Sequence, residues 1–242
     1  MLTLPPFIAH RGASADAPEN SLEAFRKAAE LGASWVEFDV MLTADGVPVV
    51  HHDDNLRRIA GVDRDMAETD FAELQEVNAT LATAIPSLEE TLAVLGKAGL
   101  LANVEIKPTP GRATETARRT IDTLRGHWGH DTPPLLSSFD WQALAVAADV
   151  MPEWPRGVLI DFRDTPDADW RRAADRLGAF SLHLDQRSAT PALVDEAKAL
   201  GLRVLTYTVN DPDRARALWN MEVDSVFTDH VTAIGEAAKS SE

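Results

Sequence analysis

The chain has 242 residues, of which 45% are hydrophobic, and it carries a formal net charge of -16. Such acidity disfavours binding to nucleic acid or to an anionic membrane, and an anionic substrate would need a local positive site. There is no cysteine, which excludes disulfides, cysteine nucleophiles and cysteine metal ligands. The length suits one large domain, so we expect residues 1–242 to form a single domain.

The chain begins with MLTLPPFIAH, which has neither a basic start nor a long apolar run. We therefore expect no signal peptide and a cytoplasmic location. No apolar run approaches the ~20 residues of a membrane helix, so we expect no stable membrane association. The sequence leaves the oligomeric state open.

Short apolar runs alternate with amphipathic stretches along the whole chain. Eight runs have the character of buried strands: 7–9, 35–41, 100–106, 134–138, 156–160, 179–184, 203–208 and 225–227. Helical periodicity is clear over 21–31, 87–98, 190–200 and 211–219. This α/β alternation predicts a (β/α)8 TIM barrel. A doubly wound open sheet is the alternative, but it usually has fewer strands, and the chain has no GxGxxG loop.

One interval breaks the alternation, between the second strand and the helix that begins near residue 87. Its sequence predicts a hairpin, TADGVPVVHHD, which turns at Asp45 and Gly46, and a short helical stretch near 68–77. We expect a small inserted subdomain over about 43–85, at the top of the barrel.

The second predicted strand, WVEFDVML, carries two acids in an otherwise apolar run. Because strand side chains alternate between faces, Glu37 and Asp39 point the same way and lie close together. Burial and mutual repulsion both disfavour their charges. A basic side chain, a shared proton or a cation must therefore compensate.

Other polar residues fall at the ends of predicted strands, where TIM barrels have their active sites. Glu105 and Lys107 close the third strand, His10 and Arg11 follow the first, and His52 ends the hairpin. Three inward acids, Glu37, Asp39 and Glu105, would form an all-oxygen site for one divalent cation, Mg2+ or Ca2+.

The positive and titratable residues suit a phosphate substrate. Arg11 and Lys107 add positive charge beside the cation, and His10 and His52 can exchange protons near neutral pH. Tyr207 ends the seventh strand and is expected to line the pocket. His183 is undecided between a packing role and the pocket, and Asp229 is expected to cap the last helix.

Eight stretches together resemble the glycerophosphodiester phosphodiesterase family and occur in family order: AHRG, APENSLEAF, GASWVEFDVMLTADGVPVVHHDDNLRR, IPSLEETL, NVEIKP, LLSSF, GLRVLTYTVN and VDSVFTD. They cover nearly the whole chain. Several look closest to the bacterial cytosolic enzyme that is encoded with the glycerol-3-phosphate uptake system. The chain has Ser21, Asn55 and Tyr207 where family members often have Thr, Thr and Trp.

The resemblance implies a TIM barrel with a small insertion and a metal-dependent enzyme that releases glycerol 3-phosphate and an alcohol from small glycerophosphodiesters. It implies that His10 and His52 are the acid/base pair. It also implies metal ligands at Glu37, Asp39 and Glu105, and phosphate binding by Arg11 and Lys107.

Three competing functions are less consistent with the sequence. A metal-dependent amidohydrolase would need an H-x-H motif on the first strand, where this chain has His10, Arg11 and Gly12. A phosphodiesterase of larger lipids would need an apolar rim or a basic patch, and neither is evident. A barrel that only binds phosphodiesters would be expected to lack one of these two histidines and three acids, but all five are present.

Overall fold

Eight parallel strands close into a barrel in the computed structural model, which describes residues 2–240. The strands are β1 (Phe7–His10), β2 (Trp35–Leu42), β4 (Leu101–Ile106), β5 (Leu135–Ser138), β6 (Arg156–Ile160), β7 (Ser181–Asp185), β8 (Arg203–Tyr207) and β9 (Ser225–Thr228). The first strand, β1, pairs with both β2 and β9 and so closes the ring. The TIM barrel predicted from the sequence is confirmed.

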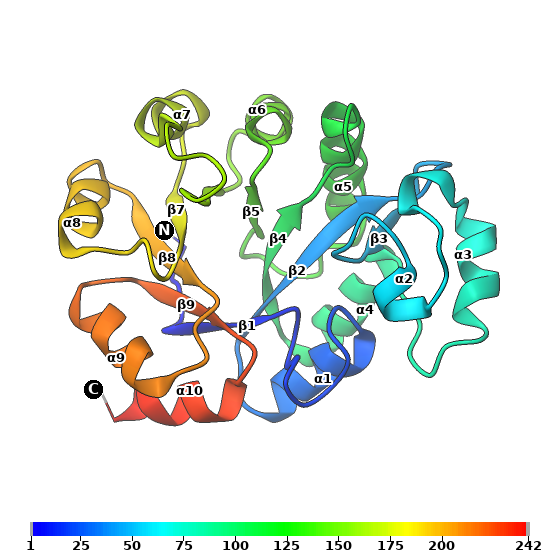
Figure 1. The fold of residues 1–242 in the computed structure, drawn as a ribbon, viewed down its shortest axis with the longest axis horizontal. Helices are drawn as coiled ribbons and strands as arrows, with labels where there is room; N and C mark the ends of the chain where they lie inside the picture. Colours follow the sequence, from blue (N-terminus) through cyan, green and yellow to red (C-terminus); the bar gives the residue numbers. More distant parts are fainter. Residues whose placement is uncertain (1, 241–242) are drawn as a thin grey trace.

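Helices surround the barrel, as Figure 1 shows. They are α1 (Leu22–Glu30), α4 (Leu88–Ala98), α5 (Ala113–His127), α6 (Trp141–Val150), α7 (Trp170–Leu177), α8 (Pro191–Ala199), α9 (Pro212–Asn220) and α10 (Val231–Lys239). Local sequence fixes several ends: Ser87 and Glu90 form a capping box at the start of α4, and Gly99 ends that helix in the left-handed conformation. No helix within residues 2–240 is long and apolar enough to span a membrane.

The interval between β2 and α4 contains β3 (Pro48–Val50), α2 (Arg57–Ala60), the short 3-10 helix η1 (Met66–Glu68) and α3 (Phe71–Asn78). As the Asp45–Gly46 turn predicts, β3 pairs with β2 in an antiparallel hairpin. Met41 of β2 packs there with Leu56, Met66 and Leu74. In Figure 1 these elements lie beside the barrel, next to β2. The assignment of 43–85 as a subdomain, and of the whole chain as one domain, stays a prediction.

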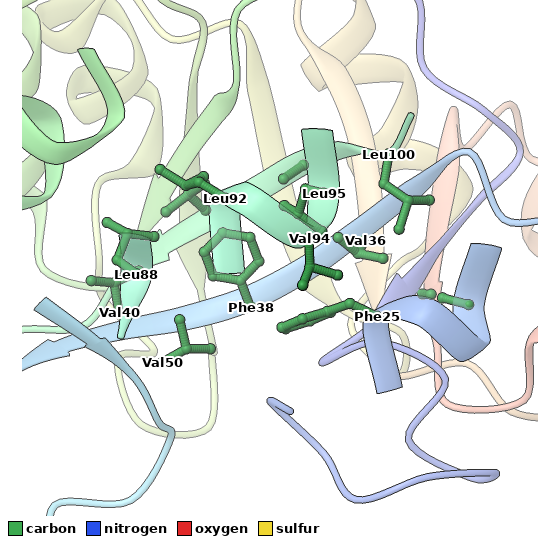
Figure 2. Packing of buried hydrophobic residues seen from close by; sticks show 14 of the residues in the cluster. Phe25, Val36, Phe38, Val40, Val50, Leu88, Leu92, Val94, Leu95 and Leu100 are labelled. Atoms are coloured by element: carbon green, nitrogen blue, oxygen red, sulfur yellow. The ribbon is translucent and has the colours of Figure 1, made fainter. Parts of the chain in front are cut away.

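The alternation expected in β2 is present. Val36, Phe38 and Val40 belong to the core between the barrel and the helices, and Figure 2 shows them facing Phe25 of α1 and the apolar side chains of α4. The rings of Phe25 and Phe38 meet edge to face, with centroids 5.6 Å apart. The opposite face of β2 therefore turns Glu37 and Asp39 into the barrel.

Candidate active site

Three carboxylates converge inside the barrel, as the sequence predicts. Glu37, Asp39 and Glu105 each offer an oxygen, and these three oxygens lie within 4.8 Å of one another. Parallel pairing sets Asp39 of β2 beside Glu105 of β4. The three residues are 4%, 2% and 9% exposed, so water screens their repulsion weakly.

Burial and repulsion disturb the ionisation of these acids. Burial, together with the charge of Asp39, raises the pKa of Glu105 to about 8. Burial also raises the pKa of Glu37 well above its usual value, and the Asp39 and Glu105 charges add to this. Burial opposes the ionisation of Asp39 too, but Arg11 and Lys107 outweigh it and lower the pKa of that carboxyl. Without a cation the three carboxyls therefore cannot all ionise, and their oxygen-only donor set fits a hard divalent cation whose charge would favour the ionised forms.

Arg11 is tied into the cluster through both its backbone and its side chain. Its backbone N–H donates to Glu37 Oε2 at 3.0 Å, and its Nε lies 3.4 Å from Asp39 Oδ2. Its Nη1 donates to Glu19 Oε1 at 2.8 Å. Lys107 approaches from the other side, with Nζ 3.9 Å from Asp39 Oδ1. Two positively charged side chains thus flank Asp39, the most buried of the three carboxylates.

His10 makes a contact that the sequence analysis missed. Its Nδ1 lies 2.7 Å from Asp229 Oδ1, and its Nε2 lies 3.9 Å from Glu37 Oε2. Asp229 also accepts hydrogen bonds from Ser14 Oγ and Asn210 Nδ2. The prediction that Asp229 caps the last helix is wrong: His230 is the residue at the N-cap of α10, and no side chain caps that helix. The carboxylate instead orients the imidazole, with Nδ1–H as donor and Nε2 turned towards the acids.

His52 lies in the loop after β3 and, like His10, has a carboxylate beside its Nδ1. Its Nδ1 lies 2.7 Å from Asp53 Oδ1. Burial lowers the pKa of His52, against the attraction of Asp39. Of the neighbouring pair, His51 turns away from the carboxylates, with Nε2 donating to Asn55 O at 3.2 Å, which agrees with the choice of His52 as the candidate.

A cavity of about 190 Å³ joins these groups. The residues that line it are His10, Arg11, Glu37, Asp39, His52, Asn103, Glu105, Phe139, Leu159, His183, Tyr207, Thr208 and Phe227. The cavity therefore brings together both histidines, all three acids, Arg11 and Tyr207. Lys107 is not part of the lining and reaches the site through Asp39.

Tyr207 and His183 both contribute to packing at this cavity. The Tyr207 hydroxyl donates to Ile160 O at 2.8 Å, and its ring meets Phe139 edge to face. The hydroxyl is thus occupied by a structural hydrogen bond, while the ring forms part of the wall. His183 is completely buried beside Ser181, and burial lowers its pKa to about 3, so it is neutral near pH 7.

Comparisons with known proteins agree with this geometry. The sequence profile of the Glycerophosphoryl diester phosphodiesterase family matches residues 10–233. A glycerophosphodiester phosphodiesterase of Caldanaerobacter subterraneus is 29% identical over 92% of this chain and 93% of its own. The structure of an Oleispira antarctica phosphodiesterase, in complex with the product sn-glycerol-3-phosphate, has a TM-score of 0.90 and 36% identity, and the match covers 98% of this chain and 97% of that one.

A second solved structure, described as a putative glycerophosphoryl diester phosphodiesterase from Silicibacter pomeroyi, has a TM-score of 0.87 and 27% identity. That match covers 98% of this chain and 95% of the other. The family and enzyme class expected from the motifs are confirmed, whereas the roles of individual site residues stay predictions. The chain belongs to the glycerophosphoryl diester phosphodiesterase family.

Proposed function

We propose that this chain hydrolyses small glycerophosphodiesters to glycerol 3-phosphate and an alcohol, with one divalent cation bound by Glu37, Asp39 and Glu105. The observation that carries the proposal is the three-carboxylate cluster, which lies in one cavity with two histidines that are each held by a carboxylate. The product complex of the Oleispira relative supports the same substrate class. The cation is Mg2+ or Ca2+, both of which prefer oxygen ligands.

A cation held by Glu37, Asp39 and Glu105 would supply positive charge that stabilises the phosphate and the transition state. Arg11 and Lys107 supply further positive charge, with Arg11 facing the cavity directly. The aromatic ring of Tyr207 forms part of the wall against which the substrate packs. These residues bind and orient the phosphodiester, while proton transfer is left to the histidines.

His10 and His52 then work as a general base and a general acid. One histidine takes the proton of the glycerol 2-hydroxyl as that oxygen attacks phosphorus, and the other gives a proton to the departing alcohol oxygen. This step forms a cyclic phosphate and breaks the bond to the alcohol. Water then opens the ring with the two histidines in exchanged roles, which yields glycerol 3-phosphate. The contacts of Nδ1 with Asp229 and Asp53 leave Nε2 of each ring for these transfers.

The test is release of glycerol 3-phosphate from glycerophosphocholine, with EDTA and then with Mg2+, Mn2+ or Ca2+ restored. We expect EDTA to abolish release and one cation to restore it. His10→Ala and His52→Ala should be inactive. His127→Ala is the control, because His127 lies on the surface, paired only with Glu89 in the ion pairs of the described chain.

No release with any cation, from glycerophosphocholine, glycerophosphoethanolamine or glycerophosphoglycerol, would contradict the proposed substrate class. Lysolipids would then be the next substrates to test. A cytoplasmic location and the lack of nucleic-acid and stable membrane partners stay predictions.

A further inference from the structure

Arg58 of α2 forms a double fork between two carboxylates that belong to different parts of the chain. Its Nε and Nη2 donate to the two oxygens of Asp53, at 2.6 and 3.1 Å. Its Nη1 and Nη2 donate to the two oxygens of Glu19, both at 2.8 Å. Asp53 lies in the insertion, whereas Glu19 lies in the loop between β1 and α1.

Each of these carboxylates holds a residue of the proposed active site. Asp53 Oδ1 accepts from His52 Nδ1 at 2.7 Å. Glu19 Oε1 accepts from Arg11 Nη1 at 2.8 Å. A continuous series of hydrogen bonds thus runs from His52 through Asp53, Arg58 and Glu19 to Arg11, which in turn contacts Asp39.

The geometry distinguishes this network of contacts from an ordinary surface ion pair. Isolated exposed pairs contribute little, but bidentate contacts within a network hold their partners firmly. Arg58 is half exposed, while the Glu19 and Asp53 side chains are partly buried. Burial opposes the ionisation of Glu19, but hydrogen bonds from Arg58 and the charge of Arg11 outweigh it and lower the Glu19 pKa to about 2.

The neighbouring Arg57 shows what a merely structural arginine of the same helix does. It pairs with Asp63, and both side chains are strongly exposed. That contact stays within the insertion and reaches no residue of the cavity lining. Arg57 and Arg58 therefore have the same charge and the same helix, but only the second is connected to the site.

We propose that Arg58 is a positioning residue, which holds His52 through Asp53 and Arg11 through Glu19 in register with the carboxylate cluster. This inference rests on the proposed function. Lysine cannot replace Arg58, because a single ammonium does not reproduce two planar bidentate contacts. Without Arg58, His52 and Arg11 would still be present, but their side chains would be free to shift relative to each other.

The experiment compares Arg58→Ala and Arg58→Lys with the control Arg57→Ala, in the full chain loaded with the activating cation. We expect Arg58→Ala to lower kcat by about 10²-fold, since misplacement by 1 Å can cost that much. The kcat of Arg58→Lys should also be lower, and the kcat of Arg57→Ala should match that of the wild type. Added guanidinium, below denaturing concentrations, should partly restore Arg58→Ala but not His52→Ala; a cavity of about 260 Å³ borders Arg58 and gives it access.

Nitrogen NMR of the His52 ring provides a readout that does not depend on activity, with His52→Gln identifying the signals. We expect the Nδ1–H tautomer in the wild type and in Arg57→Ala, and a changed signal in both Arg58 variants. Wild-type kcat in a folded Arg58→Lys protein, or an unchanged His52 signal, would overturn the inference. If Arg58→Ala does not fold, Arg58→Lys decides. If the wild type is inactive on every glycerophosphodiester, the proposed function fails, and the NMR comparison still decides the role of Arg58.

Discussion

The carboxylate cluster leads to a prediction of unusual sign: without a cation, Glu105→Gln should make the protein more stable. Glu105 is 9% exposed and lies beside Asp39 in the β2–β4 pairing. Burial and Asp39 raise its pKa from 4.5 to about 8. Between these values the folded chain holds a proton on Glu105 that the unfolded chain has released, so stability falls as the pH rises.

The pKa difference sets the size of the effect. The loss is about 1.4 kcal/mol for each pH unit above the unfolded value of 4.5, which amounts to roughly 3 kcal/mol at pH 7. Glutamine has nearly the same shape and no charge, so it avoids this cost. We expect cation-free Glu105→Gln to exceed the wild type by up to roughly 3 kcal/mol at pH 7, and by under about 1 kcal/mol at pH 5.

Urea unfolding of chelator-treated protein at pH 5, 6, 7 and 8 measures this difference. Glu76→Gln is the matched control, because Glu76 is exposed on α3 and lies outside the cavity lining. Saturating cation should reverse the order, since only the wild type retains all three ligands. A Glu105→Gln protein that is less stable than the wild type without cation, or a difference that does not change with pH, would refute this account of the cluster.

Three further predictions test other contacts. Asp229→Asn removes the carboxylate that holds His10 Nδ1, so kcat should fall by roughly 10²–10⁴-fold with an unchanged circular dichroism spectrum; a fall of under tenfold would argue against the pairing. Tyr207→Phe leaves the buried Ile160 carbonyl without its donor, which should cost about 1–3 kcal/mol in thermal unfolding while hydrolysis persists; loss of activity without loss of stability would instead place the hydroxyl in the chemistry. Cation at about 100 times its Kd should stabilise the wild type by about 2.7 kcal/mol and leave Asp39→Asn nearly unaffected in a thermal shift assay; equal stabilisation of both would indicate binding elsewhere.

Local pattern was sufficient to predict much of the fold. The period-2 alternation of β2 places Val36, Phe38 and Val40 outside the barrel and the two acids inside it. The Asp45–Gly46 turn predicts the β2–β3 hairpin, and the capping pattern at Ser87 predicts the start of α4. These features depend on residues that are close in sequence, and they need no knowledge of which strands become neighbours.

The partner of His10 could not be predicted in the same way. His10 and Asp229 are 219 residues apart and meet only because β1 pairs with β9 when the barrel closes. The contact of Arg58 with Glu19 likewise joins the insertion to the β1–α1 loop across 39 residues. The position of Asp229 after the last strand of a closed barrel could have indicated that it lies near His10. The helix that begins just after it favoured a capping role instead.

Packing outside the barrel determines the chemistry within it. The parallel register of β2 and β4 sets Asp39 beside Glu105 and Glu37 beside Asn103. A slip of one residue would turn one strand's acids to the outer face, because strand side chains alternate. The apolar side of β2, packed against Phe25 and α4, prevents this slip, since it would expose Phe38 and bury charge among leucines. The hydrophobic core therefore holds three carboxylates at a separation that they would not adopt alone, and the resulting repulsion is what a cation relieves on binding.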